Sequence, residues 1–206
     1  MSAGKLTRSM KRRHGAGGFG IEILHPGLAR EDGDSGLGAL GRIDHAHVTQ
    51  GTVVKMHPHR DDEILTYLRR GRVRHEDSVG HIEEISASRL MMMNAGHTFQ
   101  HQETVVEGPL EGLQIFLRPR APDLEPQVQF HEFGEVRSPG GWRLIAGPRD
   151  APLRVRSEAW VHDLGLAEGA AVSVPPVPEG VDGARLLYLF AGRIKVGDVT
   201  LDPGER

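Results

Sequence analysis

Short apolar runs, many of them alternating with polar residues, follow one another along the chain from Gly20 onward. Each run ends at Gly, Pro, Asp or Asn, which are the residues that terminate strands and form tight turns. The alternation predicts strands at residues 43–47, 52–56, 64–68, 73–75, 89–93 and 113–117. Many short strands at such spacing are typical of an all-β sandwich or barrel.

A proline-rich segment, residues 118–126, separates this region from a second series of apolar runs. We place a domain boundary there, with residues 1–125 forming an N-terminal domain and residues 126–206 a C-terminal one. Strands are predicted in the second domain at residues 142–146, 153–156, 159–164, 171–174, 186–190, 194–196 and 199–201.

The end of the second domain resembles only the first half of a β unit. No strand-length run follows Asp202-Pro203-Gly204-Glu205, so the C-terminal barrel is expected to be truncated. An open sheet edge needs a cover, either the N-terminal segment or a partner chain. We expect a monomer, with a dimer as the alternative if a partner chain completes this barrel.

Composition excludes several classes of site. The chain has no cysteine, which rules out disulfides, thiolate metal sites and a cysteine nucleophile. The formal net charge is −3 with basic residues scattered, so no direct nucleic-acid partner is expected. No stretch reaches the roughly eighteen apolar residues of a membrane span, and we expect a cytoplasmic protein without membrane contact.

Two pairs of potential metal ligands stand out among the twelve histidines. His57 and His59 flank Pro58, and about forty residues later His101 and Glu103 repeat the same spacing. Residues at i and i+2 of a strand point to the same side, so each pair can aim two ligand atoms at one point. Three imidazoles and a carboxylate suit Fe(II), Mn, Co, Ni, Cu or Zn.

Other polar residues near these pairs have competing interpretations. Glu63 is the main rival of Glu103 as a ligand, or else it holds a ligand imidazole through the second ring nitrogen. The i+2 spacing from His101 favours Glu103. Other histidines and one aspartate are spaced like residues on a strand surface, and we expect them to have structural roles. They are His45, His47, His75, Asp77 and His131.

These residues carry a resemblance to a known family. The segment from His57 to Tyr67, the segment from Gly71 to Gly80, and Ala95-Gly96 followed by His101-Gln102-Glu103 resemble the pirin family. Members of that family are bicupins, all-β proteins with two jelly-roll-like barrels. The resemblance is best from Gly51 to Arg118. It differs at Ser86-Ala87-Ser88 and at residues 97–100, and therefore supports metal binding better than any one substrate.

The resemblance implies one metal ion, Fe(II) being expected and Zn, Mn, Co, Ni or Cu the alternatives. Its ligands would be His57, His59, His101 and Glu103 in the N-terminal cupin, with no metal in the C-terminal domain. It also implies activity as a quercetin 2,3-dioxygenase, which opens a flavonol-like ring with O2.

In such an enzyme Glu103 would also act as catalytic base. Apolar side chains expected to wall the substrate are Met56, Leu65, Met93, Phe99 and Phe116. The alternative is a non-enzymatic, metal-sensing or redox-sensing protein that regulates a protein partner.

Overall fold

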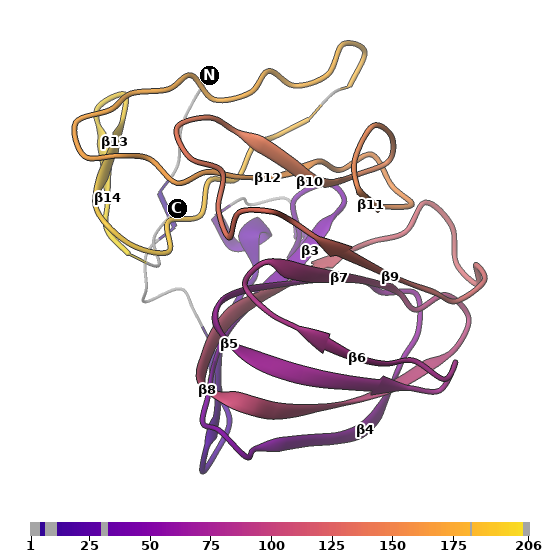
Figure 1. Ribbon diagram of the computed structural model, residues 1–206. Coiled ribbons are helices and arrows are strands. Elements are labelled where there is room, and N and C mark those ends of the chain that lie inside the picture. The colour runs from indigo at the N-terminus through magenta and orange to yellow at the C-terminus, as the bar shows by residue number, and fades with distance from the viewer. Residues whose placement is uncertain (1–4, 7–11, 30–32, 182, 204–206) are drawn as a thin grey trace.

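The computed structural model describes residues 5–6, 12–29, 33–181 and 183–203, and these are almost entirely β structure (Figure 1). A single short 3-10 helix, Pro26–Ala29, occurs among the described residues. None of the helical segments in this part of the chain has the length and apolar character needed to cross a membrane. The predicted all-β fold is confirmed.

Nine strands form one sheet that curls into the barrel of Figure 1, with the order β1-β2-β3-β8-β5-β7-β9. Strand β4 pairs with the first part of β8, and β6 pairs with β5. The strands are β1 Arg12–His14, β2 Phe19–Leu24, β3 Leu40–Val48, β4 Val53–His59, β5 Glu63–Asp77, β6 Ile82–Ile85, β7 Arg89–Asn94, β8 Phe99–Leu117 and β9 Gln127–Glu132.

The two longest strands, β5 and β8, change the parity of their inward-facing residues halfway along. Their pairing shifts register between Leu68 and Val73, where Gly71 adopts a left-handed φ of 84°. In β5, even-numbered side chains face the barrel interior before this irregularity and odd-numbered ones after it. In β8 the order is reversed, so that the interior cluster includes Ile64, Leu68, Val73, Val105, Leu110 and Phe116.

The C-terminal part of the chain covers part of the outer face of the barrel. Leu65 and Leu117 of the barrel pack with Ile145 and Leu153 in a separate apolar cluster. Ile145 belongs to a three-stranded sheet of β10 Arg143–Gly147, β11 Leu153–Arg154 and β12 Val161–Asp163. A hairpin of β13 Ile194–Val196 and β14 Val199–Leu201 follows, set to one side of the barrel in Figure 1.

Two strands predicted in the C-terminal region are wrong. Residues 171–174 and 186–190 lie outside every strand. The alternating pattern of residues 186–190 has another cause. Every second side chain of this segment, namely Leu186, Tyr188 and Phe190, packs on the buried residues Ile43 and Leu113. Their side chains reach the barrel without a neighbouring strand to pair with the backbone.

The proposed division at residue 125 remains a prediction. Strand β9 begins just after it and pairs with β7 in the barrel sheet. At the end of the chain, the described residues stop within the segment whose turn suggested a truncated barrel, and Gly204 and Glu205 lie outside them.

Candidate metal centre

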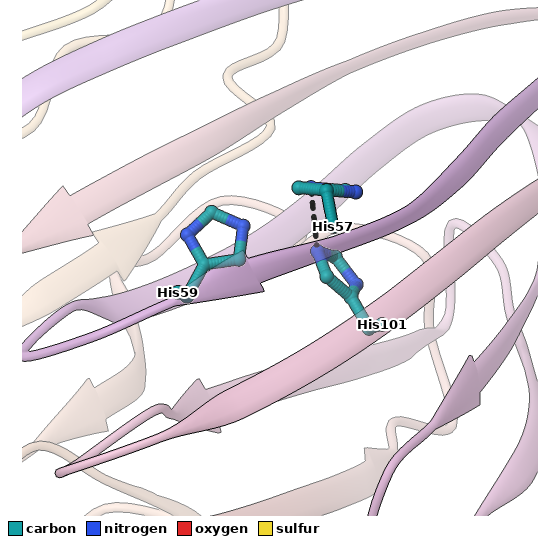
Figure 2. Close-up of side chains that lie close together, drawn as sticks. All are labelled: His57, His59 and His101. Carbon is teal, nitrogen blue, oxygen red and sulfur yellow. Dashed lines mark hydrogen bonds between the residues drawn. The ribbon is translucent and has the colours of Figure 1, made fainter.

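Three of the four predicted ligands meet inside the barrel, on β4 and on the first part of β8. His57 is the direct cross-strand partner of His101, and His59 lies two residues along the same strand. Because residues two apart on a strand share a face, all three imidazoles point to the same side. Figure 2 shows the three rings turned toward one another from these two strands.

The ring nitrogens of this group lie close enough to share one cation. One ligand atom from each of His57, His59 and His101 lies within 4.8 Å of the others, and the Nε2 atoms of His57 and His101 are 3.1 Å apart. Two imidazole nitrogens that face each other this closely need a proton or a cation between them, since two lone pairs repel. The donor set therefore fits a transition metal or zinc.

The outer nitrogens of the same rings are held by hydrogen bonds. His57 Nδ1 donates to the backbone oxygen of Lys55 at 2.8 Å, and His59 Nδ1 donates to Asp62 Oδ2 at 3.0 Å. His101 Nδ1 lies 3.4 Å from His75 Nδ1. With Nδ1 engaged in each ring, Nε2 is left as the nitrogen available to a metal.

His101 is electrostatically suited to remain neutral. Its side chain is buried, and burial together with the neighbouring His57 and His59 lowers its pKa to about 2. A neutral imidazole keeps the lone pair that a metal requires.

Glu103, the fourth predicted ligand, lies next to the imidazoles but groups differently. One carboxylate oxygen of Glu103 and one ring nitrogen from each of His101 and His75 lie within 4.8 Å of one another. The carboxylate also accepts hydrogen bonds from Gln114 Nε2 at 3.3 and 3.5 Å. Burial raises the pKa of Glu103 to about 7, while His59 and the Gln114 hydrogen bond act in the opposite direction. A carboxyl poised near neutrality can bind a cation or exchange a proton.

Glu63, the predicted rival, is engaged elsewhere. It lies on the outward-facing side of β5, fully buried, and its two oxygens accept hydrogen bonds from the backbone N–H and the Nε of Arg156. The expectation that Glu63 orients a ligand imidazole is wrong, because Asp62 makes that contact with His59. A shift of one residue places a strand side chain on the opposite face.

His75 and Asp77 were predicted at a strand surface, but the structure buries both side chains completely. His75 lies against His101, and its Nε2 is 3.0 Å from Asp77 Oδ2. Burial lowers the pKa of His75, outweighing the effect of Asp77. For Asp77, burial raises the pKa, but hydrogen bonds from His75 and from backbone N–H groups outweigh it, and the pKa is lowered. The i+2 spacing of His75 and Asp77 indicates that they share one face of the strand. The change of parity within β5 makes that face the inner one, which the sequence does not reveal.

A cavity of about 270 Å³ adjoins the imidazoles and is lined mainly by apolar side chains. Of the predicted wall, only Phe116 lines it. Met93 and Phe99 belong to the packed interior, Leu65 faces the outer side of the barrel, and Met56 is largely exposed.

One polar row crosses the cavity wall. Asp44 pairs with Gln114, which pairs in turn with Thr66, so three neighbouring strands place polar side chains side by side. Asp44 and Thr66 are buried, and Thr66 Oγ1 has no hydrogen-bond partner among the residues that the structure describes. Arg42 lies 3.3 Å from Asp44 and stacks over the Phe116 ring.

A second cluster of possible ligands lies on the outer side of β3. His45, His47 and Glu111 offer atoms within 4.8 Å of one another. The Glu111 carboxylate already lies 3.3 Å from Arg69 and 3.1 Å from Arg70, and these guanidinium groups repel a further cation. This cluster is an ionic contact on the outer side of the barrel, in which His45 and Glu111 are buried.

Known proteins similar to this chain share its family and fold. The family model described as Pirin matches residues 38–117. The quercetin 2,3-dioxygenase of Escherichia coli K12 is 32% identical over 127 residues, which are 60% of this chain and 54% of that protein. Protein PM1685 of Pasteurella multocida is 30% identical over 156 residues, 73% of this chain and 64% of that protein. The chain thus spans less than two thirds of the length of either relative.

Solved structures share the fold over nearly the whole chain. The crystal structure of YhhW from Escherichia coli superposes with a TM-score of 0.79 at 21% identity, covering 98% of this chain and 86% of that one. The structure of the bacterial pirin YhhW in complex with nickel(II) gives a TM-score of 0.77 with the same identity and coverage. The family match, the curated relatives and the shared fold show that the chain belongs to the pirin family.

Proposed function

We propose that the chain binds one divalent metal ion at His57, His59 and His101, with Glu103 beside them. We further propose that it acts as a quercetin 2,3-dioxygenase-type enzyme on a flavonol-like substrate. The observation that carries the proposal is the convergence of three imidazoles, with their outer nitrogens hydrogen-bonded, at the wall of an apolar cavity. The nickel(II) complex of YhhW and the name of the Escherichia coli K12 relative support it.

The cavity is matched to one small planar molecule. Its volume of about 270 Å³ is near the lower end, roughly 300 Å³, of the range for small-molecule sites. Apolar walls favour an aromatic ring, and the row of Asp44, Gln114 and Thr66 offers partners for ring hydroxyls. A mostly apolar cavity beside the three imidazoles favours catalysis over a purely regulatory role.

Glu103 is the proposed base for the substrate hydroxyl. Its pKa of about 7 lets it hold or release a proton near neutral pH, and Gln114 fixes the orientation of its carboxylate. A bound metal ion supplies Lewis acidity and redox chemistry with O2. The apolar walls exclude water from the reacting ring. Fe(II) is the metal that we propose for this reaction.

The test combines metal analysis with turnover. We expect the protein as isolated to contain close to one equivalent of metal. After Fe(II) reconstitution, we expect it to consume O2 while quercetin absorbance is lost. Glu103→Gln should keep the bound metal but lose most of the turnover.

Two outcomes would separate the parts of the proposal. A protein that binds no divalent metal overturns both the metal site and the enzyme. A protein that binds iron but neither consumes O2 nor alters quercetin overturns the dioxygenase function alone and favours the metal-sensing alternative.

A further inference from the structure

We propose that His75 and Asp77 form a buried hydrogen-bonded relay that sets which nitrogen His101 turns to the metal, and thereby the metal affinity. His75 and Asp77 would be positioning residues that act through His101. The inference rests on the proposed metal site and adds two residues to it. Both lie on β5, the strand that pairs with the ligand-bearing part of β8.

Asp77 anchors the relay because its own position is fixed by the turn that follows β5. Its Oδ1 accepts hydrogen bonds from the backbone N–H groups of Val79 and Gly80 at 2.9 Å and of His81 at 3.1 Å. Its Oδ2 lies 3.0 Å from His75 Nε2 and 3.0 Å from His81 Nδ1. An ionised carboxylate only accepts hydrogen bonds, so both rings donate to it.

This arrangement of hydrogen bonds determines the positions of the protons along the relay. A neutral His75 that donates from Nε2 to Asp77 presents an unprotonated Nδ1. That atom lies 3.4 Å from His101 Nδ1, which must therefore carry the proton and donate. His101 Nε2 is then left unprotonated, and it is this atom that lies 3.1 Å from His57 Nε2 (Figure 2).

The other two imidazoles have simpler supports. His57 is held by a backbone oxygen, which no side-chain substitution removes, and His59 by Asp62, whose side chain is 38% exposed. His75 and Asp77 are completely shielded from water. Hydrogen bonds of a buried carboxylate are less weakened by solvent than those of an exposed one, so the His101 support should influence affinity most.

Matched substitutions at position 75 test the relay. His75→Leu fills the space but offers no hydrogen bond, whereas His75→Gln can accept from His101 and donate to Asp77 through its amide. Titration of each metal-free variant with Ni(II) alone should give an affinity about 10- to 100-fold lower for His75→Leu, the range for such outer partners. We expect His75→Gln to stay within about threefold of the natural protein, and Asp62→Ala to lose less than His75→Leu.

A spectroscopic measurement distinguishes positioning from general damage. The visible absorption bands of the Co(II)-loaded protein should shift in His75→Leu and return in His75→Gln. Thermal unfolding of the metal-free forms reports the structural cost separately. Equal Ni(II) affinity and an unchanged Co(II) spectrum in His75→Leu would overturn the relay while leaving the metal site intact. Absence of Ni(II) binding by the natural protein would instead overturn the proposed function.

Discussion

The inner and outer faces of the barrel use the same residue types for different purposes. Inside, His57 and His59 share a face of β4, and their outer nitrogens are held so that the remaining nitrogens converge. Outside, His45 and His47 share a face of β3 with the same spacing, but their acidic neighbour Glu111 is neutralised by two arginines. His-x-His spacing therefore brings two rings together without determining whether they can bind a metal. The charges and hydrogen bonds around the rings determine that.

The largest expected effect is on Ni(II) affinity, when one histidine is removed from the inner pair and, for comparison, one from the outer pair. Structural zinc sites with four ligands bind with about 10–16 kcal/mol, or roughly 2.5–4 kcal/mol per ligand. At about 1.4 kcal/mol for each tenfold change, we therefore expect His57→Ala to weaken Ni(II) binding by about 70- to 900-fold, as measured by competition with a chelator. His47→Ala, at the exposed member of the outer pair, is the control and should bind as the natural protein does. An equal loss in both variants would place the site elsewhere.

The buried carboxylate Glu63 gives a second comparison between the two faces, because it stabilises the fold on the outer side and does not contact the predicted metal ligands. Glu63 on the outer side has its charge matched by Arg156, which joins the barrel to the C-terminal region. Arg156→Leu would leave that charge buried without its partner, and we expect the free energy of unfolding to fall by about 3–5 kcal/mol. Denaturant unfolding measures this effect. The Ni(II) affinity should stay unchanged, and a large loss of affinity would return Glu63 to the metal site.

The sequence predicted which imidazoles lie together better than it predicted the residues around them, for a physical reason. His57, His59 and His101 are close to one another because i+2 spacing on a strand is a local property that needs no knowledge of the fold. The role of His75 depends on the irregular pairing of β5 with β8, which reverses the inward-facing positions. No local pattern announces such a reversal apart from Gly71, whose left-handed backbone marks the place.

Local alternation of apolar and polar residues also predicted the barrel strands correctly. In the C-terminal region the same pattern predicted a strand that does not form. Strand β7, Arg89–Asn94, has strong apolar content and partners on both sides, so propensity and pairing agree. Residues 186–190 have the same period of two, but their alternate side chains pack on the barrel without any strand pairing. Alternation reports one buried face, and whether a backbone ladder forms depends on neighbours that the sequence does not identify.

The pH dependence of stability tests the protonation of Asp44 on the inner face of the barrel. Burial raises its pKa from 3.8 to about 6, with Arg42 opposing the rise. The folded protein thus holds this proton more tightly than the unfolded chain. Its stabilising contribution is complete below about pH 4 and is lost as the pH rises through 6. Asp44→Asn keeps a neutral group at every pH. We expect it to be more stable than the natural protein by about 2 kcal/mol at pH 8, with little difference at pH 4.

Comparing the two proteins at each pH cancels the titration of all other groups, so the change in their stability difference belongs to Asp44. Denaturant unfolding in the metal-free state provides the measurement. A stability difference that is the same at pH 4 and pH 8 would show that folding does not raise the pKa of Asp44, so that its side chain is ionised near neutral pH. Its proposed role in the polar row would then be that of a charged acceptor for a substrate hydroxyl.

The smallest expected effect concerns the contact that covers the outer histidine pair. The Tyr188 hydroxyl lies 2.6 Å from His45 Nδ1, and the Tyr188 and Phe190 rings pack edge-on against the His45 ring. Tyr188→Phe retains the ring and removes the hydroxyl, so the free energy of unfolding should fall by about 1 kcal/mol. Chemical denaturation can resolve this change, and Ni(II) affinity should not move. A loss of Ni(II) binding in Tyr188→Phe would mean that the inner and outer faces of the barrel are coupled through β3 and do not act independently.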